Sequence, residues 1–193
     1  MNYLAHVYLS CHDDDLLIGN FIADFLTTKE VQLQPPAIKR GIDLHKSIDS
    51  FTDQHPEVKA CIVILRPTQG KYSPVIADIL FDYFLTRNWH TYSDIELELF
   101  SSTVYKILEE NCDTFPSKLR TMLPHMIEDD FLLSCKNETR LIKTFERLKK
   151  RVKFDNHFDT IISDLKKHHD ELNLHFLAFF PDLIKHVNIF CNC

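Results

Sequence analysis

The sequence predicts an all-α fold, a single-domain helical bundle of roughly eight or nine helices that takes in residues 1–193. Along most of the chain, apolar residues recur at intervals of three and four, which places them on one face of a helix. The 15 phenylalanines and 6 tyrosines are accompanied by only 3 glycines. Bulky rings pack well between helices, whereas strand-rich folds need more glycine for their turns. A chain of 193 residues, 45% of them hydrophobic, is long enough to bury one core.

Prolines separate the predicted helices, because proline is tolerated in the first turn of a helix and disrupts its interior. In chain order we expect helices at about residues 2–10, 14–28, 37–54, 56–65, 73–89, 93–111, 116–127, 129–151 and 155–187. In the last of these, Leu165, Leu172 and Phe176 share one face, and Pro181 predicts a kink or a break.

Composition excludes several classes of protein. A net charge of -6 argues against a general nucleic-acid binder, which needs a basic face. No apolar run approaches the roughly 18 residues of a membrane span, and the opening "MNYLAHVYLSCHDDD" lacks the features of a signal peptide. We therefore expect a cytoplasmic protein with no membrane partner. The six cysteines contain no CxxC pair, so we expect reduced thiols, and the closing "CNC" supplies only two metal ligands.

The stretch "GIDLHKSIDSFTDQHP" carries His45, Asp49 and Asp53 at intervals of four. Residues four apart lie along one line of a helix, and here that line runs beside the apolar stripe of Leu44 and Ile48. The imidazole and the carboxylates are therefore placed like ligands at the edge of the interior. The alternative is a local His–Asp ion pair on a solvated helix edge.

The segment "VIADILFDYFL" is apolar almost all round and is interrupted only by Asp78 and Asp82. Such a helix should be buried, and a buried carboxylate must be paired or must bind a metal ion. A cation close to both carboxylates would compensate their charge. The alternative is that basic residues nearby in sequence, such as Arg66, Lys71 or Arg87, pair with them.

His6 and Asp24 are likewise surrounded by apolar residues, in "YLAHVYL" and "GNFIADFL". Four segments thus contribute to one predicted set of metal ligands, which consists of His6, Asp24, His45, Asp49, Asp78 and Asp82. Imidazole and carboxylate together suit Mn²⁺, our first choice, or Mg²⁺ or Fe²⁺. Such an ion among helices favours phosphoester hydrolysis.

Four motifs carry a resemblance to a known family. "MNYLAH", "GNFIADF", "GIDLHKSIDSFTD" and "DILFDYFLTRNW" occur in the order found in acyl carrier protein phosphodiesterases. This resemblance implies an HD-like helical fold and removal of 4'-phosphopantetheine from holo acyl carrier protein, the protein substrate. It also implies catalytic roles for His6, His45 and Asp49, with either histidine as the proton donor to the departing serine oxygen when it is not a ligand.

Three further sequence features lie outside the four motifs or depart from the usual HD pattern. "HKSID" replaces the adjacent His–Asp pair of ordinary HD enzymes, and the literal "HHD" at residues 168–170 is interpreted as packing, with His168 as a lesser candidate acid. The basic run "RLKKRVK", residues 147–153, is a candidate docking face for an acidic carrier protein, or else a solvated helix end.

Two other functions are consistent with the sequence: an HD-like phosphohydrolase of nucleotides or other small phosphoesters, and a non-catalytic helical binding module.

Overall fold

The computed structural model describes residues 2–193, and within them the fold is all-α, as predicted. The α-helices of this part of the chain are α1 (Tyr3–Tyr8), α2 (Asp14–Ile22), α3 (Thr28–Leu33), α4 (Pro36–Gln54), α5 (Pro56–Gln69), α6 (Ser73–Arg87), α7 (Trp89–Tyr92), α8 (Leu97–Glu110), α9 (Ser117–Glu128), α10 (Glu138–Arg151) and α11 (Ile161–Cys191). Short 3₁₀ helices are η1 (Ala23–Phe25), η2 (Gly70–Tyr72), η3 (Cys112–Thr114), η4 (Phe131–Leu133) and η5 (Phe158–Thr160). The described α-helices are eleven where roughly eight or nine were expected, because the short helices α3 (6 residues) and α7 (4 residues) were not expected as separate helices.

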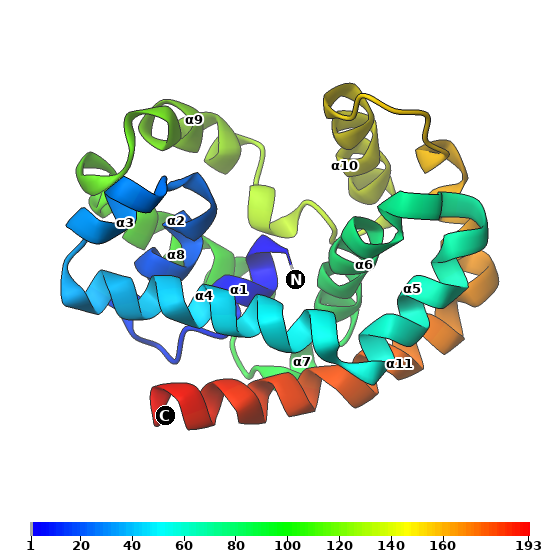
Figure 1. The fold of residues 1–193 in the computed structure, drawn as a ribbon, viewed down its shortest axis with the longest axis horizontal. Coiled ribbons are helices and arrows are strands. Elements are labelled where there is room, and N and C mark those ends of the chain that lie inside the picture. The colour runs from blue at the N-terminus through cyan, green and yellow to red at the C-terminus, as the bar shows by residue number, and fades with distance from the viewer. Residues whose placement is uncertain (1) are drawn as a thin grey trace.

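Figure 1 shows how these helices surround α1. Helices α4 and α11 run along one side of the molecule and contact each other. Helices α2, α3, α8 and α9 lie above one end of this pair, and α5, α6 and α10 lie above the other end. Helix α1 lies between the two groups and packs on both α2 and α6. None of the described helices is both long and apolar enough to span a membrane.

Local sequence signals explain where most helices begin. Pro36 and Pro56 stand at the first positions of α4 and α5, where the missing N–H has no partner to lose. Asp13 caps α2 by accepting from the Leu16 amide, and Asn137 caps α10 in the same way. Helix α6 is apolar nearly all round and is accordingly buried on most of its faces.

Helices α2 and α4 approach each other backbone to backbone. A Cβ atom on Gly41 would stand 2.5 Å from the Leu16 carbonyl oxygen and 2.7 Å from the Gly19 Cα. A Cβ atom on Gly19 would collide with the Ile38 carbonyl oxygen in turn. Only glycine fits at these two positions, and the close approach brings Asn20 of α2 within hydrogen-bond distance of His45 on α4.

Three predicted helices differ from the observed ones. The expected helix at 14–28 breaks after α2, because η1 turns the chain and Thr27 with Glu30 forms a capping box that starts α3. The expected helix at 129–151 is helical only from residue 138, and η4 precedes it. Helix α11 continues through Pro181, and its non-helical residue is His168 (φ -116°), so the kink lies at a different place from the one predicted.

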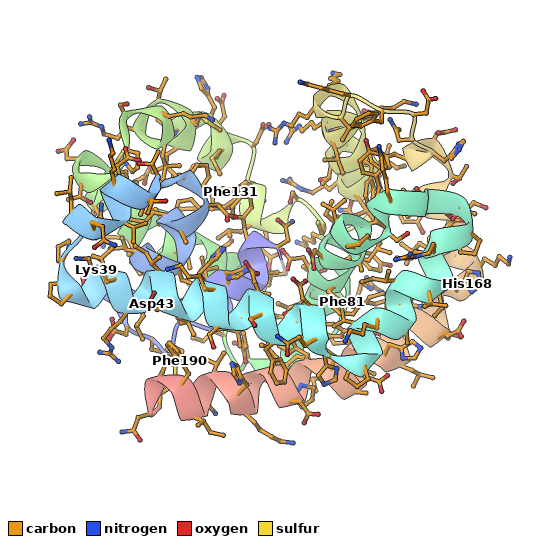
Figure 2. The ribbon with its side chains drawn as sticks, in the orientation of Figure 1. Lys39, Asp43, Phe81, Phe131, His168 and Phe190 are labelled. Carbon is orange, nitrogen blue, oxygen red and sulfur yellow. A yellow bond between two sulfur atoms is a disulfide. The ribbon has the colours of Figure 1, made fainter. Side chains whose placement is uncertain are left out.

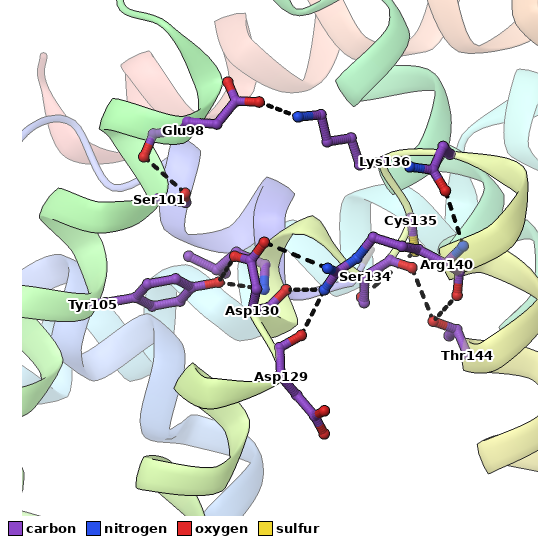
Figure 3. A network of polar contacts seen from close by, with 12 residues as sticks. Glu98, Ser101, Tyr105, Asp129, Asp130, Ser134, Cys135, Lys136, Arg140 and Thr144 are labelled. Atoms are coloured by element: carbon purple, nitrogen blue, oxygen red, sulfur yellow. Dashed lines mark hydrogen bonds and ion pairs between the residues drawn. The ribbon is translucent and has the colours of Figure 1, made fainter.

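A polar network holds α10 in place (Figure 3). Asp130 has a left-handed backbone (φ 52°) and accepts a hydrogen bond from the Tyr105 hydroxyl on α8 (2.7 Å). The Arg140 guanidinium of α10 donates to the carbonyl oxygens of Asp129 (2.5 Å) and Asp130 (2.8 Å). Lys136 also pairs with Glu98. The position of α10, and of the basic residues at its end, is therefore fixed against α8 and η4.

Candidate metal centre

Four of the six predicted ligands come together. The Nε2 atom of His6, on α1, lies 3.3 Å from an Asp49 oxygen. The Nε2 atom of His45 lies 3.2 Å from Asp49 and 3.2 Å from Asp24. The two imidazole rings stack with their centroids 4.2 Å apart. His45 and Asp49 share one face of α4 as their spacing predicted, and Asp24 reaches them from η1, where it is not helical as expected.

Asn20 orients both rings. The His45 Nδ1 atom lies 2.9 Å from the Asn20 backbone oxygen, and a carbonyl oxygen can only accept, so Nδ1 carries the proton. The Asn20 amide nitrogen donates to the His6 carbonyl (2.7 Å) and to Ser10 (3.2 Å). Its oxygen therefore faces His6 Nδ1 (2.8 Å), which must also be the donor. In the neutral form of each ring, the Nε2 lone pair is then directed at the carboxylates, as a metal ligand requires.

Burial and hydrogen bonding set the protonation of the cluster. Burial lowers the pKa of His6, and the hydrogen bond to Asp49 offsets this only in part. Burial also acts to lower the pKa of His45, but its hydrogen bonds to Asp24 and Asp49 outweigh this and raise it to about 9. For Asp49, burial raises the pKa, yet the hydrogen bonds from both histidines hold it well below its usual range. The carboxylates are thus ionised, and positive charge beside them is favoured.

The cluster opens into a cavity of about 90 Å³. The cavity is lined by Asn2, Tyr3, His6, Asn20, Phe21, Asp24 and His45. Tyr3 stacks on Phe25 with 6.4 Å between ring centroids and makes an edge contact with Phe131. Tyr3 and Phe21 are thus the aromatic residues of the lining, and further rings pack behind Tyr3. At this volume the cavity is large enough to admit water molecules or a small polar group.

Asp82 and Asp78 do not join this cluster. The buried Asp82 carboxylate accepts hydrogen bonds from the backbone amides of Leu4 (3.0 Å) and Ala5 (3.3 Å). Burial raises its pKa to about 7. Asp78 lies half-buried one turn earlier on α6. Within the part of the chain that the structure describes, the metal-ligand group that includes His6 is completed by His45 and Asp49. The apolar setting of Asp82 correctly signalled burial, but amides at the start of α1 supply the compensating dipole.

Other sequence candidates lie elsewhere. His168 stands at the kink of α11, at the far end of the molecule in Figure 2, and pairs with Glu171. His169 packs edge-on against Phe84, 5.5 Å between ring centroids, in agreement with a packing role. Sequence reasoning missed Asn20, although a carboxamide among the apolar residues of "LLIGNFI" carries the same signal of a satisfied buried polar group as His6 does.

Comparison with known proteins identifies the family. A family model described as acyl carrier protein phosphodiesterase matches residues 1–183. The chain is 25% identical over 186 residues to an acyl carrier protein phosphodiesterase from Pectobacterium atrosepticum, and 26% identical over 187 residues to one from Escherichia coli, with 96% of each chain covered in both cases. A protein of the same name from Serratia proteamaculans is 36% identical over 89 residues, 46% of each chain. No solved structure matches the chain significantly. Since the family model takes in nearly the whole sequence, the chain belongs to the acyl carrier protein phosphodiesterase family.

Proposed function

We propose that this protein is a divalent-metal-dependent phosphodiesterase that removes 4'-phosphopantetheine from holo acyl carrier protein and leaves the apo form. The observation that carries the proposal is the convergence of His6, Asp24, His45 and Asp49 in one cluster, where His6, Asp24 and His45 also line the cavity. Each comes from a motif through which the chain resembles the family. The relatives compared above are named for this activity.

The donor set fits a borderline or hard divalent ion. Ligand atoms of His6, His45 and Asp49 all lie within 4.8 Å of one another, and Asp24 contacts His45 from the exposed side. Two imidazoles with carboxylates and no thiolate favour Mn²⁺, with Mg²⁺ and Fe²⁺ as alternatives. When bound, such an ion lowers the pKa of a coordinated water molecule and neutralises phosphoryl oxygens.

The protein's own residues position the substrate. The phosphoryl group enters the cavity lined by His6, Asp24 and His45, and the prosthetic group and the carrier protein extend outside it. Tyr3 and Phe21 exclude water on one side, while Asp24 stands at the more exposed edge. His6 and His45 hold fixed orientations through Asn20, so the site is organised before substrate arrives.

The end of α10 is the proposed docking face for the carrier protein. Arg147 pairs with Asp129 (2.9 Å) and Lys149 approaches Asp159 (3.8 Å), which leaves Lys150, Arg151 and Lys153 on the exposed surface. Burial and the charge of Asp24 raise the pKa of Tyr3, whereas the charge of Arg151 lowers it. The basic end of α10 therefore acts electrostatically on the wall of the cavity. An acidic carrier protein bound there would present its phosphodiester to the cluster.

The test is incubation of holo acyl carrier protein with the enzyme and Mn²⁺, followed by intact mass measurement. We expect the carrier to lose the mass of its prosthetic group. His45→Ala, Asp49→Asn and removal of the metal by a chelator should each abolish the loss. Hydrolysis of nucleotides but not of holo carrier would show that the substrate class is wrong. A purified protein with no stoichiometric divalent ion and no activity would be a helical binding module.

A further inference from the structure

Three cysteines that are far apart in sequence meet on the side of the molecule where α11 ends. The sulfur atoms of Cys11, Cys191 and Cys193 all lie within 4.8 Å of one another. Cys11 lies between α1 and α2, and Cys191 is the last residue of α11. We propose that these three thiolates form a second metal site, separate from the histidine and carboxylate cluster, for a thiophilic ion such as Zn²⁺.

The backbone on both sides of the site has a defined shape. Cys11 and His12 are both left-handed (φ 53° and 54°), and the turn is closed by the Asp13 amide, which donates to the Ser10 carbonyl (3.0 Å). At the end of α11, Asn192 is left-handed (φ 59°) and the Cys193 amide donates to the Asn188 carbonyl (3.2 Å). This is the 6→1 bond of a Schellman cap. It turns Cys193 back toward Cys11 instead of away into solvent.

The chemistry of this site differs from that of the first. Thiolates select soft and borderline ions, whereas the mixed nitrogen and oxygen cluster suits Mn²⁺. Cys11 and Cys191 are half-buried and Cys193 is exposed, so an ion can reach the sulfur atoms directly. Three thiolates around a divalent ion carry one excess negative charge. Burial raises the pKa of the Cys191 thiol and the charge of Asp13 adds to this, while the charge of Arg40 acts in the opposite direction, so the bound ion itself must favour the thiolate.

The site has an oxidised state that excludes a metal ion. In the structure, Cys11 and Cys193 form a disulfide, where the sequence predicted reduced thiols, and their Cα atoms are 6.2 Å apart. A phosphine reductant cleaves this bond: the phosphine takes an oxygen atom from water, and the two hydrogen atoms pass to the two sulfur atoms. The ion then displaces the three thiol protons. The site therefore loads only in reduced protein.

The test uses full-length protein with His45→Ala and Asp49→Asn, so that the first cluster does not compete for metal. After reduction with a phosphine and removal of metal, the protein is titrated with Cd²⁺ alone, and thiolate-to-metal charge transfer is followed in the near ultraviolet. We expect one equivalent of Cd²⁺ to bind with this absorption, and protein first loaded with Zn²⁺ to gain the absorption as Cd²⁺ displaces the Zn²⁺. Untreated, disulfide-bonded protein should show no such absorption.

Serine variants identify the ligands. Cys11→Ser, Cys191→Ser and Cys193→Ser should each weaken Cd²⁺ binding by about ten-fold or more, whereas the control Cys112→Ser, a half-buried free cysteine on η3, should leave it unchanged. Absence of the charge-transfer band in reduced protein would overturn the proposal. So would full affinity in Cys191→Ser, which would reduce the site to a two-cysteine disulfide. Both results are independent of whether the protein hydrolyses holo carrier.

Discussion

The carboxamide and the backbone carbonyl of Asn20 each fix one imidazole ring of the candidate metal centre. Asn20 is fully buried, and its amide nitrogen is itself held by His6 and Ser10. A polar residue with this many partners in an apolar environment restricts the two rings to one tautomer and one orientation. The affinity of the site should therefore depend on a residue that donates no ligand atom to the metal.

Asn20→Ala tests this dependence. It removes the acceptor for His6 Nδ1 but keeps the backbone carbonyl that holds His45, so we expect Mn²⁺ affinity to fall by about 10- to 100-fold without abolishing binding. Calorimetric titration of the metal-free protein measures it. Asn173→Ala is the matched control, since the Asn173 carboxamide on α11 accepts a hydrogen bond from the amide nitrogen of Asn88 (2.8 Å), just after α6, and takes no part in the candidate metal centre. Equal affinity in Asn20→Ala and the parent would contradict the assigned role.

Asp82 makes stability depend on pH. Burial raises the pKa of its carboxyl from the ordinary value of 3.8 to about 7 in the folded protein, so the folded state binds the proton more tightly than the unfolded chain. The stability from this group is then fully present below pH 4 and is lost as pH rises from about 4 to about 7, on the order of 4 kcal/mol in total. Urea unfolding of metal-free parent and Asp82→Asn at pH 5 and pH 7.5 measures the difference.

Asp82→Asn has no titratable group at position 82. The free energy of unfolding of the parent should therefore fall relative to that of Asp82→Asn as the pH rises from 5 to 7.5. Asp94→Asn, at an exposed position, serves as control and should follow the parent. A constant difference between parent and Asp82→Asn would mean that the two amides of α1 keep the carboxylate ionised throughout.

At the scale of elements, the contact between α2 and α4 determines how close Asn20 comes to His45. Gly19 and Gly41 allow this contact because neither has a Cβ atom. Spreading the helices would lengthen the bond from His45 to the Asn20 carbonyl, which is 2.9 Å in the structure. The glycines of two sequence motifs thus affect the geometry of the candidate metal centre through helix spacing.

Gly41→Ala should therefore cost about 1–3 kcal/mol of stability through overpacking and should also weaken Mn²⁺ binding. Gly70→Ala is the control: Gly70 has a positive φ (53°) but open space around it, so alanine there should cost about 1–2 kcal/mol with no change in metal affinity. Chemical denaturation and metal titration of both variants distinguish the two effects. Equal losses of Mn²⁺ affinity in Gly41→Ala and Gly70→Ala would show that the spacing of α2 and α4 does not determine the affinity.

Sequence patterns predicted the elements that carry strong local signals. Helices α4, α5 and α6 begin near prolines, and their positions followed from Pro36, Pro56 and Pro74. The spacing of His45 and Asp49 likewise predicted their shared face. Asp24 was expected in a helix and lies in η1, because the capping box at Thr27 competes with continued helix. Asp82 shows the other limit: burial of a carboxylate is readable from sequence, but the identity of its partner depends on tertiary contacts.

At the scale of the whole molecule, charge is distributed unevenly. The chain carries a net charge of -6, yet the end of α10 presents Lys149, Lys150 and Arg151 together. Because α10 is tied to α8 and η4 through Arg140, these charges keep a fixed position relative to the cavity. Long-range attraction of an acidic partner should then be strongest at low salt.

The combined variant Lys149→Glu, Lys150→Glu and Arg151→Glu should lower kcat/KM for holo carrier protein by about ten-fold or more at low salt, since each exposed charge contributes about 1 kcal/mol or less. Hydrolysis of a small generic phosphodiester should be unchanged. The control, with the same change in charge, is Lys59→Glu, Lys167→Glu and Lys185→Glu on the exposed surfaces of α5 and α11. Equal kinetics in both triple variants would place the docking face elsewhere.

Helix α4 lies between α2 on one side and α5 and α11 on the other, with Leu44 and Ile48 fully buried, whereas α3 has no buried residue. Amide hydrogens at the centre of α4 should consequently exchange with deuterium only when the whole protein unfolds, while those of α3 exchange through local opening. Addition of Mn²⁺ should raise the free energy of the opening that permits exchange in α4 by as much as it raises the global free energy of unfolding. The exchange rates of α3 should stay unchanged. Exchange of α4 at the rate of α3 would mean that His45 and Asp49 become ordered only when the ion arrives.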